Sequence, residues 1–83
     1  MLLWSDAAWD DYLIWQTEDR RILKRINSLI RDVQRNGTHG IGKPEPLKHA
    51  LHGYWSHRID QEHRLACRID GDDVLIAACR FHY

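Results

Sequence analysis

Apolar residues recur with helical spacing in the first half of the chain and with strand spacing in the second. Ser5 is a suitable N-cap for a helix that starts at Asp6, because its hydroxyl can accept a bond from the first turn. Thr17 is the expected cap of a second helix, and Asn36-Gly37 is its expected end. The apolar positions of this second helix form one stripe that a sheet can cover: Ile22, Ile26, Leu29, Ile30 and Val33.

The remaining segments predict strands and one long loop. Residues 2–4 form a short first strand, and residues 38–51, with two glycines and two prolines, form a loop. Asp70-Gly71-Asp72 is a strong hairpin signal between the last two strands. The order β-α-α-β-β-β indicates an α+β fold, with two helices packed on one face of a small, mostly antiparallel twisted sheet. The later strands are predicted at residues 54–60, 63–70 and 74–83.

Alternation along these later strands sorts their side chains onto two faces. One set is almost wholly apolar and is expected to bury against the helices: Trp55, His57, Ile59, Leu65, Cys67, Ile69, Leu75, Ala77, Cys79 and Phe81. The other set holds every arginine of the strands: Tyr54, Ser56, Arg58, Arg64, Ala66, Arg68, Ile76, Ala78, Arg80 and His82. Arginines on the solvent side of a sheet are common, but no acid is interleaved with these, so this face is a candidate polyanion-binding surface.

Composition and charge narrow the class of protein. The 83 residues predict a single domain, 1–83, with a marginal core. Net charge is zero, but residues 20–58 carry nine Lys or Arg against two acids, a local balance of +7 that favours contact with polyanions. There is no signal-peptide pattern, no apolar run of membrane-spanning length, and too few cysteines for a disulfide scaffold, so a cytoplasmic protein with reduced thiols is expected.

These residue types suit RNA cleavage. RNA carries its own nucleophile, the ribose 2′-hydroxyl beside the scissile phosphate, so cleavage needs a base, an acid and cations but no metal. Glu45 is the only acid between Asp32 and Asp60, so its basic neighbourhood should keep it ionised and able to act as the base. His82 suits the general acid near neutral pH. The candidates for phosphate binding and for stacking on bases are Lys48, Arg58, Arg64, Tyr54 and Tyr83.

Longer strings of residues are more specific than these spacings. They are Gly42-Lys43-Pro44-Glu45-Pro46-Leu47-Lys48, Gly53-Tyr54-Trp55-Ser56-His57-Arg58-Ile59, Glu62-His63-Arg64-Leu65 and Leu75-Ile76-Ala77-Ala78-Cys79-Arg80-Phe81-His82-Tyr83. Together with the opening Trp4-Ser5 and Trp9-Asp10-Asp11-Tyr12, they resemble the YoeB (Txe) family of toxins within the RelE superfamily. The resemblance covers essentially the whole chain, and it implies a small microbial-ribonuclease-like sheet with two helices.

The resemblance also implies a function and partners. It implies a toxin of a type II toxin–antitoxin system that cuts messenger RNA in the A site of the 70S ribosome and so inhibits translation, with no cofactor. A cognate antitoxin of the YefM or Axe type is implied, and often a homodimer. By position, Glu45 matches the family's proposed base, His82 its proposed acid, Arg64 its transition-state stabiliser, and Tyr83 the terminal residue of the site. The residues expected to bind RNA and phosphate are Lys43, Lys48, Arg58 and Tyr54.

The sequence departs from the family's pattern at two positions. The family commonly has arginine where His57 stands and an aromatic residue where Cys67 stands. Because His57 belongs to the core-side set, a change in packing or in an interface is expected at His57. Zinc bound by histidines and cysteines is an alternative, although no C-x-x-C pair is present. A ribosome-binding protein without catalytic activity is a second alternative. Glu45 argues against it, because phosphate binding gains nothing from an acid. The sequence also leaves open whether cleavage needs the ribosome to hold the messenger.

Overall fold

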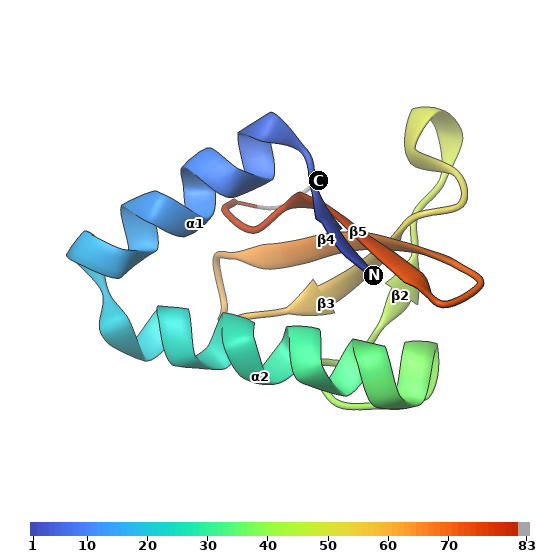
Figure 1. Ribbon diagram of the computed structural model, residues 1–83, viewed down its shortest axis with the longest axis horizontal. Coiled ribbons are helices and arrows are strands. Elements are labelled where there is room, and N and C mark those ends of the chain that lie inside the picture. Colours follow the sequence, from blue (N-terminus) through green and yellow to red (C-terminus); the bar gives the residue numbers. More distant parts are fainter. Residues whose placement is uncertain (82–83) are drawn as a thin grey trace.

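The computed structural model describes residues 1–81, which form two helices and a five-stranded sheet (Figure 1). The strand order is β1-β5-β4-β3-β2, with β1 parallel to β5 and every other pair antiparallel. This confirms the predicted α+β class. Neither helix of the described residues is long and apolar enough to cross a membrane. The elements are β1 (Leu2–Trp4), α1 (Asp6–Glu18), α2 (Arg20–Asn36), β2 (Glu45–Pro46), β3 (Trp55–Arg58), β4 (Arg64–Asp70) and β5 (Asp73–Ala78).

The two helices begin at polar caps, of which one was predicted and one was not. The Ser5 hydroxyl accepts the N–H of Ala8 at 3.0 Å, as expected for the start of α1. Thr17 is not the cap of α2, because α1 continues to Glu18 and the Thr17 hydroxyl donates to a carbonyl in the last turn of α1. Asp19 caps α2 instead: its carboxylate accepts the N–H groups of Arg21 and Ile22, in the first turn of the helix, at 3.0 and 3.2 Å.

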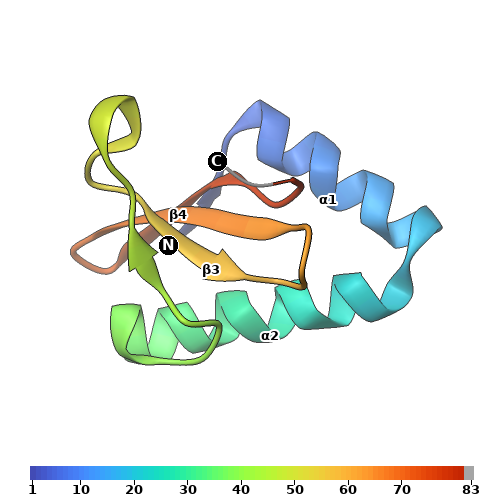
Figure 2. The same ribbon diagram turned by 180° about the vertical axis from the view of Figure 1, so that it is seen from behind.

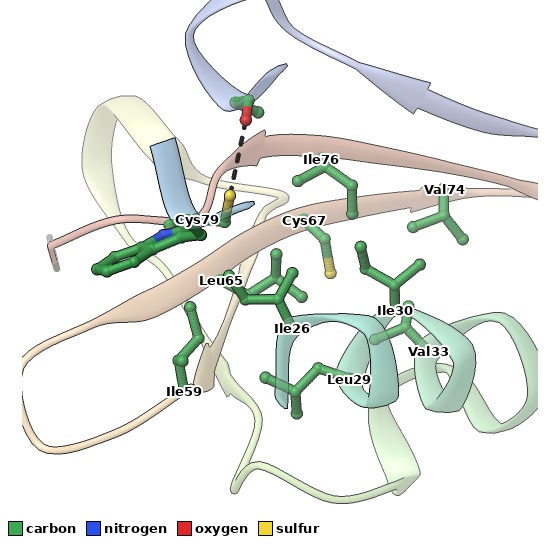
Figure 3. Close-up of a cluster of buried hydrophobic side chains, with 12 residues drawn as sticks. Ile26, Leu29, Ile30, Val33, Ile59, Leu65, Cys67, Val74, Ile76 and Cys79 are labelled. Carbon is green, nitrogen blue, oxygen red and sulfur yellow. Dashed lines mark hydrogen bonds between the residues drawn. The ribbon is translucent and has the colours of Figure 1, made fainter. Parts of the chain in front are cut away.

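The core lies between α2 and the sheet, and α1 closes one end of it (Figure 3). The predicted stripe of α2 is confirmed, since Ile26 and Leu29 are 0% exposed and Ile30 and Val33 are also buried. From α1, the indole N–H of Trp15 donates to the Cys79 carbonyl at 2.8 Å. The buried core residues from the strands, and from the positions directly after β3 and β5, are Ile59, Leu65, Cys67, Val74, Ile76 and Cys79.

The alternation predicted for the last strand is wrong over most of its length. Ile76, expected on the arginine face, is 0% exposed in the core, whereas Leu75 is only partly buried on the other side. The pairing of β5 with β4 shifts between Ile76 and Ala78, which leaves Ala77 as an extra residue in β5. A bulge of this kind reverses the alternation. Cys79 therefore returns to the core, as predicted.

The loop and the chain end also differ from the predicted boundaries. The predicted loop over residues 38–51 contains β2, an edge strand of Glu45–Pro46 that pairs with β3 (Figure 2). Proline is tolerated at a sheet edge because one side of an edge strand is unpaired. β5 ends at Ala78 and does not continue to residue 83. The predicted site residues His82 and Tyr83 lie outside the described residues.

Candidate functional site

Strand pairing places Glu45 beside two arginines. Glu45 pairs with Ser56 across β2 and β3, and Arg58 pairs with Arg64 across β3 and β4. Paired residues project from the same face of a sheet, and Ser56 and Arg58 are two positions apart in β3. All four side chains therefore lie on one face. His57, between Ser56 and Arg58, projects the other way and is buried in the core.

These side chains line a small pocket of about 40 Å³, together with one lysine from the preceding loop. A larger and shallower hollow of about 490 Å³ lies along α2 and contains no predicted site residue. Four predicted site residues therefore come together, and Ser56 joins them. Sequence reasoning missed Ser56, because its position opposite Glu45 is visible only once β2 is known. The pocket is lined by Lys43, Glu45, Ser56, Arg58 and Arg64.

The loop that leads into β2 is held against α2 and β3. The Asp32 carboxylate of α2 accepts the N–H of Ile41 at 2.8 Å, and the N–H of Arg58 donates to the Gly42 carbonyl at 2.7 Å. Gly42 has a φ of 83°, and a Cβ there would lie 2.7 Å from a side-chain atom of α2. Glycine is required here because the loop approaches the helix so closely. These contacts set the point from which the chain continues into Glu45.

Arg64 is anchored by the turn that precedes β4. Its guanidinium donates to the carbonyls of Asp60 at 2.7 Å and His63 at 3.1 Å. Partial burial alone would raise the pKa of the Asp60 carboxyl, but the N–H groups of His63 and Glu62 hold that pKa below its ordinary value. Within residues 1–81, neither Arg64 nor any other charged residue of the pocket forms an ion pair. The cations of the pocket, Lys43, Arg58 and Arg64, are therefore available to bind an external anion.

Other predicted site residues lie outside the pocket. Lys48 is exposed beside the short 3₁₀ turn His49–Leu51 and is not part of the lining. The ring of Tyr54 lies 5.9 Å from the guanidinium of Arg68, on the face opposite to the core. Both could contact RNA beyond the pocket. Nothing in the geometry places His82, which lies past the described residues together with Tyr83.

Arg80 was expected on the arginine face, and this prediction is wrong. Its guanidinium lies 3.8 Å from the Glu18 carboxylate and 5.6 Å from the ring centre of Trp15, both in α1. β5 ends at Ala78, so Arg80 lies beyond the regular alternation of the sheet. The arginine face of the sheet therefore consists of Arg58, Arg64 and Arg68.

The two departures from the family's pattern contact each other. The His57 Nε2 lies 3.1 Å from the Cys67 sulfur, and both side chains are 0% exposed. Burial lowers the pKa of His57, although the Ile41 carbonyl and the Asp32 carboxylate partly oppose this shift. His57 is therefore a neutral core residue, on the face that alternation predicted.

A metal site finds no support in the described part of the chain. Within residues 1–81, no group of three or more histidine, cysteine or acidic side chains is placed to hold a metal ion. Cys67 and Cys79 are buried and unpaired, and each is a small core residue of the kind expected for a structural cysteine.

Both cysteines are expected to resist thiol reagents in the folded protein. Burial raises the pKa of Cys67 to about 12, and burial together with the nearby Asp11 raises the pKa of Cys79 to about 12. At pH 8, about one thiol in 10⁴ is then ionised and reactive. Ellman's reagent should leave the native protein unmodified and should label both cysteines in urea. Equal labelling rates in the native and unfolded protein would contradict this expectation.

Comparison with known proteins assigns the chain to a family. Residues 4–83 match the family described as YoeB-like toxin of bacterial type II toxin-antitoxin system. Toxin YoeB of Escherichia coli (strain K12) is 58% identical over 82 residues, which cover 99% of this chain and 98% of that protein. A YoeB–YefM complex from Staphylococcus aureus is similar in structure, with a TM-score of 0.93 and 43% identity over 100% of this chain and 97% of that one. The YoeB dimer from Staphylococcus aureus has a TM-score of 0.92 and 44% identity over 99% of this chain and 95% of that one. The chain therefore belongs to the YoeB-like toxins of bacterial type II toxin–antitoxin systems.

Proposed function

We propose that this toxin is an endoribonuclease that cleaves messenger RNA by attack of the ribose 2′-hydroxyl, without a metal or cofactor. The observation that carries the proposal is the pocket in which Glu45 is surrounded by Lys43, Arg58 and Arg64. Attack by a neighbouring hydroxyl is intramolecular, so the protein needs to supply only proton transfer and charge stabilisation. A carboxylate among cations, beside a basic face of the sheet, provides the groups for both.

The four charged residues of the pocket and His82 each have a proposed role in this reaction. Glu45 accepts the 2′ proton while the 2′ oxygen bonds to phosphorus. Arg58 and Arg64 stabilise the extra negative charge on the phosphate oxygens through paired N–H donors, and Lys43 adds a point charge. The bond from phosphorus to the 5′ oxygen breaks, and His82 gives that oxygen its proton. The products are a 2′,3′-cyclic phosphate and a 5′-hydroxyl.

The pocket is too small to hold the RNA substrate by itself. A volume of about 40 Å³ has room for about three water molecules, far less than a nucleotide occupies. Most of the RNA must then be held outside the pocket, where Lys48 and Tyr54 are the proposed contacts. Tyr83 is proposed as a further contact by its place in the family's motif. We propose that the ribosome presents the messenger in its A site in the cytoplasm, and that cleavage there stops translation.

Two partners are proposed by similarity. The relatives from Staphylococcus aureus include a YoeB–YefM complex and a YoeB dimer, each matched over nearly the whole chain. We propose that this toxin is likewise neutralised by an antitoxin of the YefM type and forms a homodimer. A chain of 83 residues builds only a small core, so burial of further surface in either assembly would stabilise it.

Cleavage on programmed ribosomes tests the proposed function. Ribosomes carry either an all-ribose messenger or one with a single 2′-deoxy nucleotide at the expected cleavage site, and primer extension maps the cuts. We expect a cut with a 2′,3′-cyclic phosphate end on the first messenger and none on the second. Cutting of the deoxy messenger would refute attack by the 2′-hydroxyl. Stalling of translation without cuts on either messenger would indicate a binder without catalysis.

Removing the proposed acid should lower the cleavage rate strongly, by an amount that depends on the leaving group. His82→Ala is expected to lower the single-turnover rate by about 10²–10⁴-fold, because the 5′ oxygen then leaves without a proton. A messenger with sulfur at that bridging position has a leaving group that needs no proton, and it should be cut by the variant at nearly the wild-type rate. His39→Ala, which changes an exposed histidine outside the pocket, is the matched control. An equal defect on both messengers would argue against His82 as the acid.

A further inference from the structure

Phe81, directly before the proposed acid, has an unusual backbone conformation. Its φ is 60°, in the left-handed region that a bulky side chain rarely adopts. Such a conformation persists only where surrounding contacts over-determine it. Because His82 follows Phe81 in the chain, the direction of the backbone at Phe81 sets where the proposed acid begins.

These contacts come from His63, directly before β4, and Arg64, the first residue of β4. The N–H of Phe81 donates to Nδ1 of His63 at 2.8 Å, and the carbonyl of Phe81 accepts the N–H of Arg64 at 2.7 Å. Both backbone polar groups of Phe81 are therefore bound by one dipeptide. The side chain of Arg64 also lines the pocket that contains Glu45. The same dipeptide thus connects the pocket to the end of the described chain.

The geometry determines the tautomer of His63. A backbone N–H can only donate, so Nδ1 must be unprotonated and the ring proton must lie on Nε2. Nε2 lies 3.5 Å from the carboxylate of Glu62, an acceptor that favours this tautomer. His63 is 7% exposed, and its ring centre lies 4.7 Å from that of Trp15 and 5.6 Å from that of Phe81. Both the place and the tautomer of the imidazole are therefore set by its neighbours.

We propose that His63 is a positioning residue, which holds the Phe81 backbone through Nδ1 so that His82 can reach the leaving oxygen. This inference rests on the proposed function, in which His82 is the acid. His63 does not line the pocket, and its imidazole transfers no proton in the reaction. A group displaced by about 1 Å can cost a reaction about 10²-fold, so loss of this hydrogen bond should lower the rate even where the fold is kept.

Variants with nearly equal shapes separate the hydrogen bond from the packing. In His63→Asn an amide oxygen can take the place of Nδ1, whereas His63→Leu has a similar shape and no acceptor. We expect His63→Leu to lower kcat by about 10–100-fold with little change in KM, because the cations of the pocket remain. His63→Asn should recover most of that loss. His63→Phe keeps a ring against Trp15 but has no acceptor, so its kcat should resemble that of His63→Leu.

A second measurement does not depend on catalysis. Amide hydrogen exchange at Phe81, followed by NMR, should be slow in the wild type and in His63→Asn and faster in His63→Leu and His63→Phe. Thermal unfolding of each variant identifies any variant that is not folded. If one of the two acceptor-free variants is unfolded, the other is compared with His63→Asn. A purely structural role would lower the unfolding temperature and raise KM together, without rescue by His63→Asn.

The combined readouts make the proposal falsifiable apart from the proposed function. Wild-type kcat and a slowly exchanging Phe81 amide in both acceptor-free variants would overturn it. An equal loss of kcat in His63→Asn and His63→Leu, with the amide still protected in His63→Asn, would also overturn it. If the wild type itself does not cleave RNA, the proposed function fails, and the exchange rates alone then decide whether His63 holds Phe81.

Discussion

Replacing Glu45 with alanine is expected to slow messenger cleavage by about 10²–10⁴-fold, the range typical for removal of a general base. Glu45→Gln should lose as much, because the amide keeps the size of the side chain but cannot accept the 2′ proton. Glu45 is exposed on the edge strand β2 and is not part of the core, so the free energy of unfolding should change by less than about 0.5 kcal/mol. Single-turnover cleavage on ribosomes and urea unfolding measure the two quantities.

The control and the binding behaviour distinguish this role from a structural one. Asp10→Ala removes an exposed acid of α1 outside the pocket, and it should cleave like the wild type. Removing the negative charge from among Lys43, Arg58 and Arg64 should leave RNA binding unchanged or tighter, because less repulsion acts on the phosphate. A Glu45→Ala variant that cleaves at the wild-type rate would eliminate Glu45 as the base.

Ile26→Ala should cause the largest loss of stability, about 2–5 kcal/mol in the free energy of unfolding. Ile26 is 0% exposed and belongs to the buried core cluster that Figure 3 shows between α2 and the sheet. The loss combines the transfer of apolar atoms to water with the cavity that remains. At about 0.05–0.15 kcal/mol per residue, a chain of 83 residues has only about 4–12 kcal/mol in total. The variant should therefore be partly unfolded at 37 °C.

Urea unfolding followed by tryptophan fluorescence measures this effect. Ser28→Ala, on the exposed side of the same helix, is the matched control and should keep the wild-type midpoint. An Ile26→Ala midpoint equal to that of the wild type would show that α2 is not the main core helix. Antitoxin binding should raise the midpoint of the variant, because a ligand that binds only the folded state stabilises it.

The helices and the hairpin could be predicted from the sequence because their determinants are local. The stripe that contains Ile26 repeats every three or four residues, and Gly37 ends α2 with a φ of 60°. Ser5 caps α1 from three residues away. Gly71, with a φ of 59°, allows the turn between Asp70 and Asp73. Each feature depends on neighbours within one turn, so the residues themselves determine it. The prediction that Thr17 caps α2 was wrong because Asp19, two positions later, is also a good cap and competes for the same helix start.

The chemical groups of the site could also be predicted, but their meeting could not. Glu45 stands out as an isolated acid in a basic stretch of sequence. Its neighbours in space depend on the pairing of β2 with β3, which joins Glu45 to Ser56 across eleven positions of the chain. That pairing is too short to leave a pattern of its own. The failed prediction for Leu75 and Ile76 has a similar origin, because the single extra residue at Ala77 reverses the alternation within β5.

The sequence by itself therefore determined the two helices, the hairpin, the α+β class and the types of residue in the site. Only the tertiary structure decided the register of β5, the edge strand that carries Glu45, and the contact of His63 with Phe81. The physical reason is the range of the interactions. Caps, turns and apolar stripes act within a few residues, whereas strand partners, bulges and buried hydrogen bonds are selected by packing between residues that are far apart in the chain.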